Sequence, residues 1–195
     1  MLILTSNGLS SPELRAAVRP LLASFRRAAL ITTASVEFKE RDKHIPRLTA
    51  ELRDVGLAEV SLFDLDAQPV EELLFFDVVE ILGGNPFYLL QAMRRTDCAR
   101  VLQRIRQERA LIGVSAGTMV LQRSIELAAL LTPEMNENVG LTNWEGLALT
   151  DVEILPHYSR FCARFADYKA RGQALSLAHG TRLVCLDDGQ AHIEP

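Results

Sequence analysis

Residues 110–121 read ALIGVSAGTMVL, and this stretch decides the fold. Residues 110–114 form an apolar run of strand length, and residues 116–121 are compatible with a helix. Between them, Gly113, Ser115 and Gly117 make a G-x-S-x-G sequence. A strand-to-helix connection with this sequence holds its serine on a sharp turn, where small flanking residues avoid steric clashes. The stretch therefore predicts a nucleophile elbow with Ser115 at its tip and the amide of Ala116 directed at a developing oxyanion.

Apolar strands alternate with amphipathic segments on both sides of the elbow, which predicts parallel βαβ units. The expected strands are residues 1–5, 28–33, 60–65, 78–82, 110–114, 147–155 and 182–186, and the expected helices are residues 12–27, 42–55, 86–91, 97–108 and 161–178. Residues 132–144 are polar and predict a loop, and the final strand is expected to stop after a few residues. We expect one α/β domain over residues 1–195, with a mostly parallel sheet flanked by helices, as in flavodoxin-like three-layer folds.

The composition is that of a globular domain, because 195 residues with 48% hydrophobic side chains can bury a core. A net charge of -4 gives no electrostatic reason to expect a nucleic-acid partner. No apolar run approaches the roughly 20 residues needed to cross a bilayer, and the MLILT start lacks a basic leader. The three cysteines are far apart and predict neither a disulfide framework nor a metal site. We expect a cytoplasmic protein with no membrane partner.

A second glycine motif, Gly83-Gly84-Asn85, follows the expected strand at residues 78–82. It should lie at the same sheet edge as the elbow. Amides that carry no side chain can approach a developing oxyanion closely. The pair could also form only a turn or a cradle for a small anion. Beside an elbow, it predicts that Gly84 supplies the second amide of an oxyanion hole.

A serine nucleophile needs a base, and the position of His157 distinguishes it from the other histidines. It follows the expected strand at residues 147–155 directly, behind Pro156. The carboxyl edge of an open α/β sheet is where sites assemble. His44 begins a polar helix and is expected to face solvent, and His179 lies near a helix end. His192 lies in the terminal strand.

The acid that would orient the imidazole is less certain from the residues alone. Asp187 and Asp188 follow the strand at residues 182–186 and could reach the same edge, although Asp-Asp-Gly is also a common turn sequence. Glu134, in the polar segment after the elbow helix, is a rival acid. All three remain open at this point.

Three motifs together resemble the peptidase E family of serine peptidases. They are Gly83-Gly84-Asn85 with Phe87 and Leu89-Leu90, the elbow GVSAG at residues 113–117, and Pro156-His157-Tyr158. The resemblance runs from residue 1 to about residue 190. It implies a fold like that of class I glutamine amidotransferases and cleavage of dipeptides with an N-terminal aspartate. It also implies that no metal or other cofactor is needed, and that a monomer or homodimer acts on small Asp-Xaa dipeptides.

The resemblance assigns roles to individual residues. Ser115 becomes the nucleophile and His157 the base, Gly84 and Ala116 supply the oxyanion amides, and Asp188 takes the place of the acid. Asn85 and Arg171 are expected to bind substrate, with Arg171 facing the substrate's aspartate carboxylate and Arg160 and Arg164 as rivals. The chain departs from the family in carrying Leu82 before its two glycines and Glu134 where some members carry aspartate.

Two other classes of protein share parts of this pattern. An α/β-hydrolase esterase would order its triad as Ser115, then Asp187 or Asp188, then His192. A non-catalytic flavodoxin-like module would bind a small anion at Gly83-Gly84 and the elbow helix. A glutaminase would need cysteine at the elbow, where this chain has serine.

Overall fold

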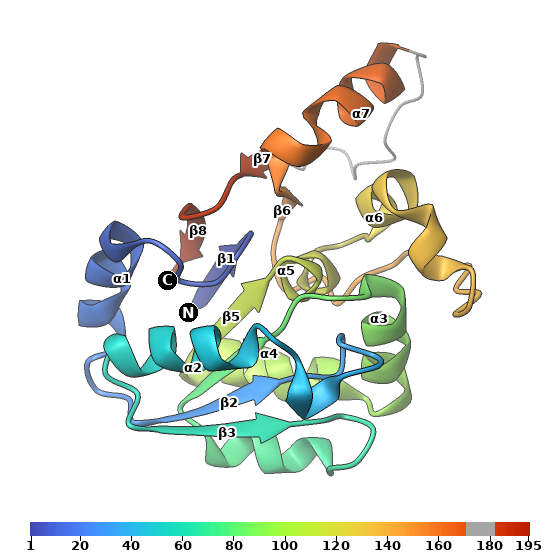
Figure 1. Cartoon of the computed structure of the whole chain (residues 1–195). Coiled ribbons are helices and arrows are strands. Elements are labelled where there is room, and N and C mark those ends of the chain that lie inside the picture. Colours follow the sequence, from blue (N-terminus) through green and yellow to red (C-terminus); the bar gives the residue numbers. More distant parts are fainter. Residues whose placement is uncertain (171–181) are drawn as a thin grey trace.

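The computed structural model of the chain describes residues 1–170 and 182–195. Its larger sheet contains β1 (Leu2–Thr5), β2 (Arg27–Ile31), β3 (Glu59–Phe63), β4 (Val78–Ile81), β5 (Ala110–Val114) and β8 (Ala191–Glu194). The strands lie in the order β3-β2-β4-β5-β1-β8 (Figure 1). All neighbours pair in parallel except β1 and β8, which are antiparallel. The predicted mostly parallel α/β sheet is confirmed.

Helices cover both faces of this sheet, which explains why its strands read as nearly continuous apolar runs. On one face lie α1 (Pro12–Val18) and α2 (Ile45–Asp54). Their Leu14 and Leu52 pack against Ile3 and Ile112. On the other face lie α3 (Pro86–Arg95), α4 (Cys98–Glu108) and α5 (Ala116–Leu121). The three layers are those of the predicted fold class.

A second, two-stranded parallel sheet consists of β6 (Val152–Pro156) and β7 (Arg182–Leu186). Together with α7 (Tyr158–Ala170), it lies beyond the carboxyl ends of β1 and β5, at the top of Figure 1. The strand expected at residues 147–155 begins later than predicted. Its first residues instead return to the elbow helix, because the amides of Leu147 and Leu149 donate to the carbonyls of Val120 and Leu121.

The short terminal segment forms a full edge strand. Residues 191–194 of β8 pair antiparallel with β1, so that Leu2 faces Glu194 and Thr5 faces Ala191. The two ends of the chain therefore lie side by side (Figure 1). This pairing covers the edge of β1 and fixes the turn that precedes β8.

Several helix boundaries differ from those predicted. The helix expected at residues 12–27 changes at Val18 into a 3-10 turn, η1 (Arg19–Leu22), because Pro20 cannot donate the next helical hydrogen bond. Two further 3-10 turns, η2 (Lys39–Arg41) and η3 (Val70–Phe75), are short elements that the sequence patterns did not predict. So is α6 (Glu126–Leu131), which precedes η4 (Pro133–Asn136) in the expected loop. Across residues 1–170 and 182–195, every helix is too short or too polar to cross a membrane.

Candidate active site

The candidate residues gather where the two sheets meet. The strand ends lead into Ser6 and Asn7 after β1, Leu82 to Gly84 after β4, Ser115 after β5, His157 after β6, and Asp187 and Asp188 after β7. Parallel strands present their carboxyl ends at one edge, so segments far apart in the sequence converge there. The structure thus brings together five of the segments from which a site could be built.

The elbow has the backbone geometry that its sequence predicts. Ser115 lies at φ 50° and ψ -107°, outside the regions that side chains favour. A Cβ added to Gly117 would lie 2.2 Å from the carbonyl oxygen of Ile81, and one added to Gly113 would lie 2.9 Å from the amide nitrogen of Thr118. Both glycines are therefore required for the turn to pack against β4 and the start of α5. The turn holds the Ser115 hydroxyl out at the sheet edge.

His157 reaches the serine from the second sheet. Its backbone also has a positive φ, 53°, and its amide donates to the hydroxyl of Ser6 at 3.1 Å. This anchors the turn after β6 to the end of β1. The ring nitrogen Nε2 lies 3.1 Å from Oγ of Ser115. If Nδ1 carries the proton, Nε2 is free to accept the serine proton.

Of the three candidate acids, Asp188 is the one beside the imidazole. Its Oδ1 lies 3.3 Å from Nδ1 of His157. Asp187 instead accepts from the amide and the hydroxyl of Ser159, and these two hydrogen bonds lower the pKa of Asp187 below its usual value. Glu134 lies in η4, on the wall of a neighbouring cavity. The geometry therefore separates the three residues that the sequence left open.

Asn7 holds the far side of Asp188, a contact that sequence reasoning missed. Its Nδ2 donates to Oδ2 of Asp188 at 3.1 Å. Arg47 of α2 donates to the backbone carbonyl of Asn7 at 2.9 Å and to its side-chain oxygen at 2.8 Å. Arg47 is paired in turn with Glu51 at 2.5 Å. The one sequence signal for Asn7 is its position just after a buried strand, which places it at the carboxyl edge of the sheet.

Below this network lies a buried carboxyl group, Glu80 of β4. Its exposed fraction is 1%, and neither of its oxygens has a hydrogen-bond partner among the described residues. Burial, together with the nearby charge of Glu51, raises the pKa of Glu80 to about 8, although Arg47 opposes the shift. The raised pKa favours the protonated form of Glu80 near neutral pH.

Two backbone amides flank Ser115. Gly84 has a φ of +143°, and a Cβ there would lie 2.3 Å from the carbonyl oxygen of Ala34. Only glycine fits this conformation and this approach. Ala116 is the first residue of α5, where an amide has no intrahelical acceptor. Within the described residues, neither amide donates a hydrogen bond to a backbone carbonyl.

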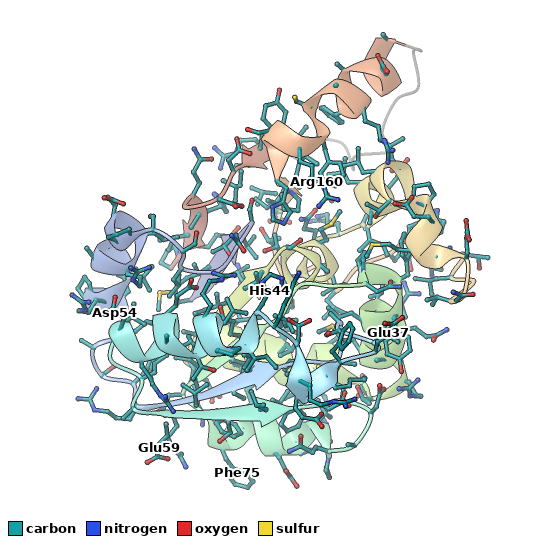
Figure 2. The ribbon with its side chains drawn as sticks, viewed as in Figure 1. Glu37, His44, Asp54, Glu59, Phe75 and Arg160 are labelled. Atoms are coloured by element: carbon teal, nitrogen blue, oxygen red, sulfur yellow. The ribbon has the colours of Figure 1, made fainter. Side chains whose placement is uncertain are left out.

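Two cavities meet at the serine. The larger has a volume of about 640 Å³ and the smaller about 390 Å³. Gly84, Ser115, His157 and Arg160 line both. Figure 2 shows Arg160 in the first turn of α7 and His44 at the start of α2, and both line the larger cavity. His44 is exposed, as expected, but it faces this cavity. The two cavities therefore extend from Ser115 in different directions.

The smaller cavity combines apolar walls with two opposite charges. Met119, Leu131 and Phe161 supply apolar surface, and Glu134 supplies an acid. The guanidinium of Arg160 lies 5.1 Å from the centre of the Phe161 ring. This cavity is therefore suited to a small group that carries both a positive and a negative charge.

The other residues expected to bind substrate lie elsewhere. Arg171 is outside the described residues. Arg164 donates to the backbone carbonyl of Leu131. Asn85 caps α3, because its side-chain oxygen accepts from the amides of the two residues after Pro86, and its Nδ2 donates to the carbonyl of Met135 at 2.7 Å. The carboxamide of Asn85 is thus used within the protein and not presented to the cleft.

The rival base lies away from the serine. His192 is in β8, with its Nε2 3.3 Å from Oε1 of Glu194, and it lines neither cavity. His179 is outside the described residues. The esterase ordering of the triad therefore lacks its histidine at the site. In the described part of the chain, no three His, Cys, Asp or Glu side chains are grouped as metal ligands.

Comparison with solved structures supports the fold. A crystal structure of a candidate peptidase E protein from Listeria monocytogenes has a TM-score of 0.69 and 25% sequence identity to this chain, covering 97% of this chain and 91% of that one. A peptidase from an acI-B1 actinobacterium has a TM-score of 0.65 at 21% identity, covering 95% and 79%. The resemblance to peptidase E is confirmed by this similarity.

Curated relatives match over shorter stretches. An uncharacterized peptidase of Listeria monocytogenes is 36% identical over 85 residues, which is 43% of this chain and 40% of that protein. One from Pasteurella multocida is 30% identical over 113 residues, 57% and 52% of the two chains. The matched stretches thus span about half or less of these relatives. The family model for peptidase family S51 matches residues 2–193, and the chain therefore belongs to peptidase family S51.

Proposed function

We propose that the protein is a serine peptidase that hydrolyses dipeptides with an N-terminal aspartate. The observation that carries the proposal is the 3.1 Å separation between Nε2 of His157 and Oγ of Ser115, both held on positive-φ turns. Strained conformations of this kind persist where the surrounding structure requires them, and they are enriched at active sites.

In the proposed first step, Ser115 Oγ attacks the carbonyl carbon of the scissile peptide bond. Its proton passes to Nε2 of His157 as the new C–O bond forms. The carbonyl oxygen becomes an oxyanion, which accepts hydrogen bonds from the amides of Gly84 and Ala116. The imidazolium gives its proton to the leaving nitrogen, the C–N bond breaks, and an aspartyl ester of Ser115 remains.

In the second step, water attacks the ester carbonyl. His157 takes a proton from the water, the same two amides stabilise the oxyanion, and the proton returns to Ser115 as free aspartate leaves. Asp188 acts throughout by keeping the proton on Nδ1 and by stabilising the imidazolium, as its 3.3 Å contact permits.

The selectivity for aspartate is assigned to the smaller cavity. An N-terminal aspartyl residue carries an ammonium and a carboxylate, and Glu134 and Arg160 offer the opposite charges. Arg160 is preferred among the described arginines because it borders Ser115, whereas the Arg164 guanidinium is directed to Leu131. Arg171, which the family resemblance names, remains a rival.

The function is tested by hydrolysis of aspartyl-, alanyl-, glutamyl- and lysyl-p-nitroanilides. Wild type is expected to prefer the aspartyl substrate and to react with a fluorophosphonate probe. Ser115→Ala should lose both properties, at a cost on the order of a million-fold in kcat. Ser61→Ala, which removes an exposed hydroxyl of β3, should retain them. Activity above a few per cent in a folded Ser115→Ala protein would refute the mechanism.

The choice of arginine has its own test. Arg160→Ala should lower the ratio of kcat/KM for aspartyl over alanyl substrate, because the carboxylate loses its partner. Arg164→Ala is the matched control and should leave that ratio close to the wild-type value. If only Arg171→Ala lowers the ratio, Arg160 does not bind the aspartate carboxylate.

A further inference from the structure

One wall of the larger cavity carries an excess of positive charge. The segment of residues 38–47, which we call the basic loop, includes η2 and the start of α2. Its ionisable side chains that line the cavity are Arg41, Asp42, Lys43, His44 and Arg47. The protein as a whole has a net charge of -4, so this concentration of cations is local.

Two of these charged side chains, Arg47 and Asp42, already have partners within the protein. Arg47 is paired with Glu51 and donates to Asn7. Asp42 accepts from the hydroxyl of Ser35 at 2.5 Å and from the backbone amide of His44 at 2.8 Å. Within residues 1–170 and 182–195, the side chains of Arg41, Lys43 and His44 make no hydrogen bond or ion pair. These three are therefore available to a ligand.

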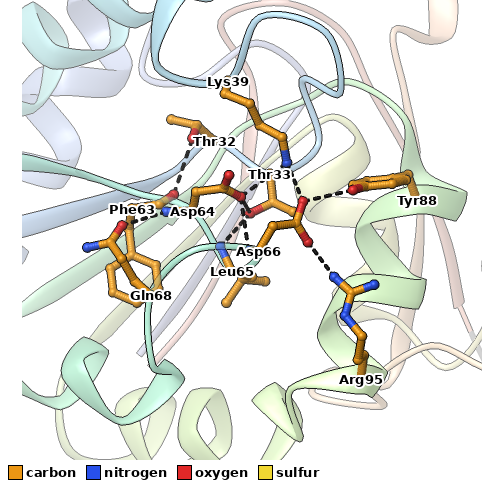
Figure 3. Close-up of polar contacts among 10 residues, drawn as sticks. All are labelled: Thr32, Thr33, Lys39, Phe63, Asp64, Leu65, Asp66, Gln68, Tyr88 and Arg95. Atoms are coloured by element: carbon orange, nitrogen blue, oxygen red, sulfur yellow. Dashed lines mark hydrogen bonds and ion pairs between the residues drawn. The ribbon is translucent and has the colours of Figure 1, made fainter.

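The other side of the basic loop is fixed to the protein by the network in Figure 3. Lys39 donates to Asp64 at 3.1 Å and to Asp66 at 2.5 Å. Asp66 also accepts from the hydroxyl of Tyr88 at 2.8 Å and is paired with Arg95. Partial burial works against ionisation, but the hydrogen bonds from Lys39 and Tyr88 keep the pKa of Asp66 below its usual value.

This anchoring holds Lys39 on the side of the loop away from the cavity, while Arg41, Lys43 and His44 line the cavity. Because the two cations Lys39 and Arg95 pair with the two carboxylates Asp64 and Asp66, those carboxylates are already balanced and do not pair with the cations at the cavity. Phe38, which is 56% exposed, lies beside them and adds an apolar surface at the cavity wall. The loop thus offers cations and an aromatic ring together, which suits a small amino acid better than a bare inorganic anion.

We propose that Arg41, Lys43 and His44 form a subsite for the free α-carboxylate of the leaving amino acid. The inference rests on the proposed function, which places the aspartyl residue in the smaller cavity. The residue after the scissile bond then enters the larger cavity. Its carboxylate carbon is only two covalent bonds from the scissile nitrogen, and the cavity that receives it is lined both by Ser115 and by these three side chains.

The subsite would explain a restriction to dipeptides. A carboxylate that leaves water loses its hydrogen bonds to water, and charged donors must replace them. A guanidinium can supply two parallel hydrogen bonds. An amide in the same place gains much less from the two cations, Arg41 and Lys43, and from the imidazole of His44. A longer peptide carries its carboxylate about 3.5 Å further for each added residue, past these side chains.

The experiment compares kcat/KM for aspartyl-leucine and aspartyl-leucinamide, which differ only in the C-terminal group. Wild type should prefer the free acid. Arg41→Ala should lower the ratio of free acid to amide by about tenfold, the size expected for a charge-assisted hydrogen bond. Arg41→Lys should restore part of it, and the double variant Arg41→Ala/Lys43→Ala should lower it further. Thermal unfolding of each variant checks that the fold is retained.

Arg53→Ala is the matched control, because Arg53 is an exposed cation of α2 that lines neither cavity. It should leave the ratio at the wild-type value. If wild type cleaves both substrates equally well, or if Arg41→Ala and the double variant lower both to the same extent, the subsite is refuted while the proposed function stands. If wild type cleaves neither substrate nor aspartyl-p-nitroanilide, the proposed function fails and this inference fails with it.

Discussion

Replacement of Asp188 tests how the imidazole is oriented. The carboxylate of Asp188 is 3.3 Å from Nδ1 of His157, and its side chain is 59% exposed. In the proposed mechanism, Asp188→Ala removes both the acceptor that keeps the proton on Nδ1 and the charge that stabilises the imidazolium. Hydrolysis should therefore slow, although Ser115 and the oxyanion amides stay in place.

The size of the effect follows from the distance and the exposure. Two unit charges 3.3 Å apart interact by about 1 kcal/mol in water and about 5 kcal/mol at the effective dielectric constant of about 20 found near protein surfaces. Solvent screens a carboxylate that is more than half exposed, so a value of about 2 to 3 kcal/mol is appropriate. That corresponds to a ~30-fold to ~150-fold loss in kcat/KM.

The assay is kcat/KM for aspartyl-p-nitroanilide in four proteins. Asp187→Ala is the control, because Asp187 binds Ser159 and not the imidazole, and its activity should stay within about threefold of wild type. Asp188→Asn should be at least as damaging as Asp188→Ala, because an amide that donates to Nδ1 favours the wrong tautomer. Rescue by asparagine would mean that Asp188 only anchors Asn7. Full activity in Asp188→Ala would remove it from the mechanism.

Three further predictions concern the base, the elbow and the buried carboxyl. His157→Ala should lose activity almost as completely as removal of the nucleophile, whereas His192→Ala should keep it, and the opposite result in p-nitroanilide assays would favour the esterase order. Gly117→Ala should destabilise the protein by about 1 to 3 kcal/mol in urea unfolding, because its Cβ would lie 2.2 Å from a backbone carbonyl of β4, and an unchanged midpoint would contradict the packing. Glu80 has a pKa of about 8 in the folded protein against 4.5 in the unfolded chain. The folded protein therefore keeps a proton that the unfolded chain releases, so stability falls between about pH 4.5 and pH 8. Glu80→Gln should flatten that fall, measured by urea unfolding at pH 5.5 and pH 8, and a slope equal to that of wild type would show that Glu80 ionises normally.

The elbow and the parallel strands could be predicted because their causes are local. Residues 110–114 form β5 with the predicted limits, since an apolar run before a glycine-bounded turn has few alternatives. His157 could also be singled out, because Pro156 and the preceding strand place it at the sheet edge. The predicted ends of strands and helices were less accurate. Residues 147–149 bond to α5 instead of extending β6, a tertiary contact that no local pattern encodes.

The contacts around the acid could not be predicted for the same reason. Asn7 and Asp188 are 181 positions apart in the sequence, and they meet only because β8 pairs with β1 and the turn before β8 is thereby fixed. The proposed role of the basic loop also could not be predicted from the sequence. His44 reads as an exposed residue at a helix start, and only the folded structure turns it toward the larger cavity.

The candidate site lies between two sheets, and the hydroxyl of Ser6 connects them. Ser115, the proposed nucleophile, follows a strand of the larger sheet, whereas His157 and Asp188 follow strands of the smaller one. The spacing between Nε2 and Oγ therefore depends on how the two sheets are joined. Ser6, which is fully buried, accepts from the amide of His157 and donates to the carbonyl of Leu186 at 2.8 Å. One hydroxyl at the end of β1 thus holds the strand before the acid and the turn of the base against the sheet that carries the serine.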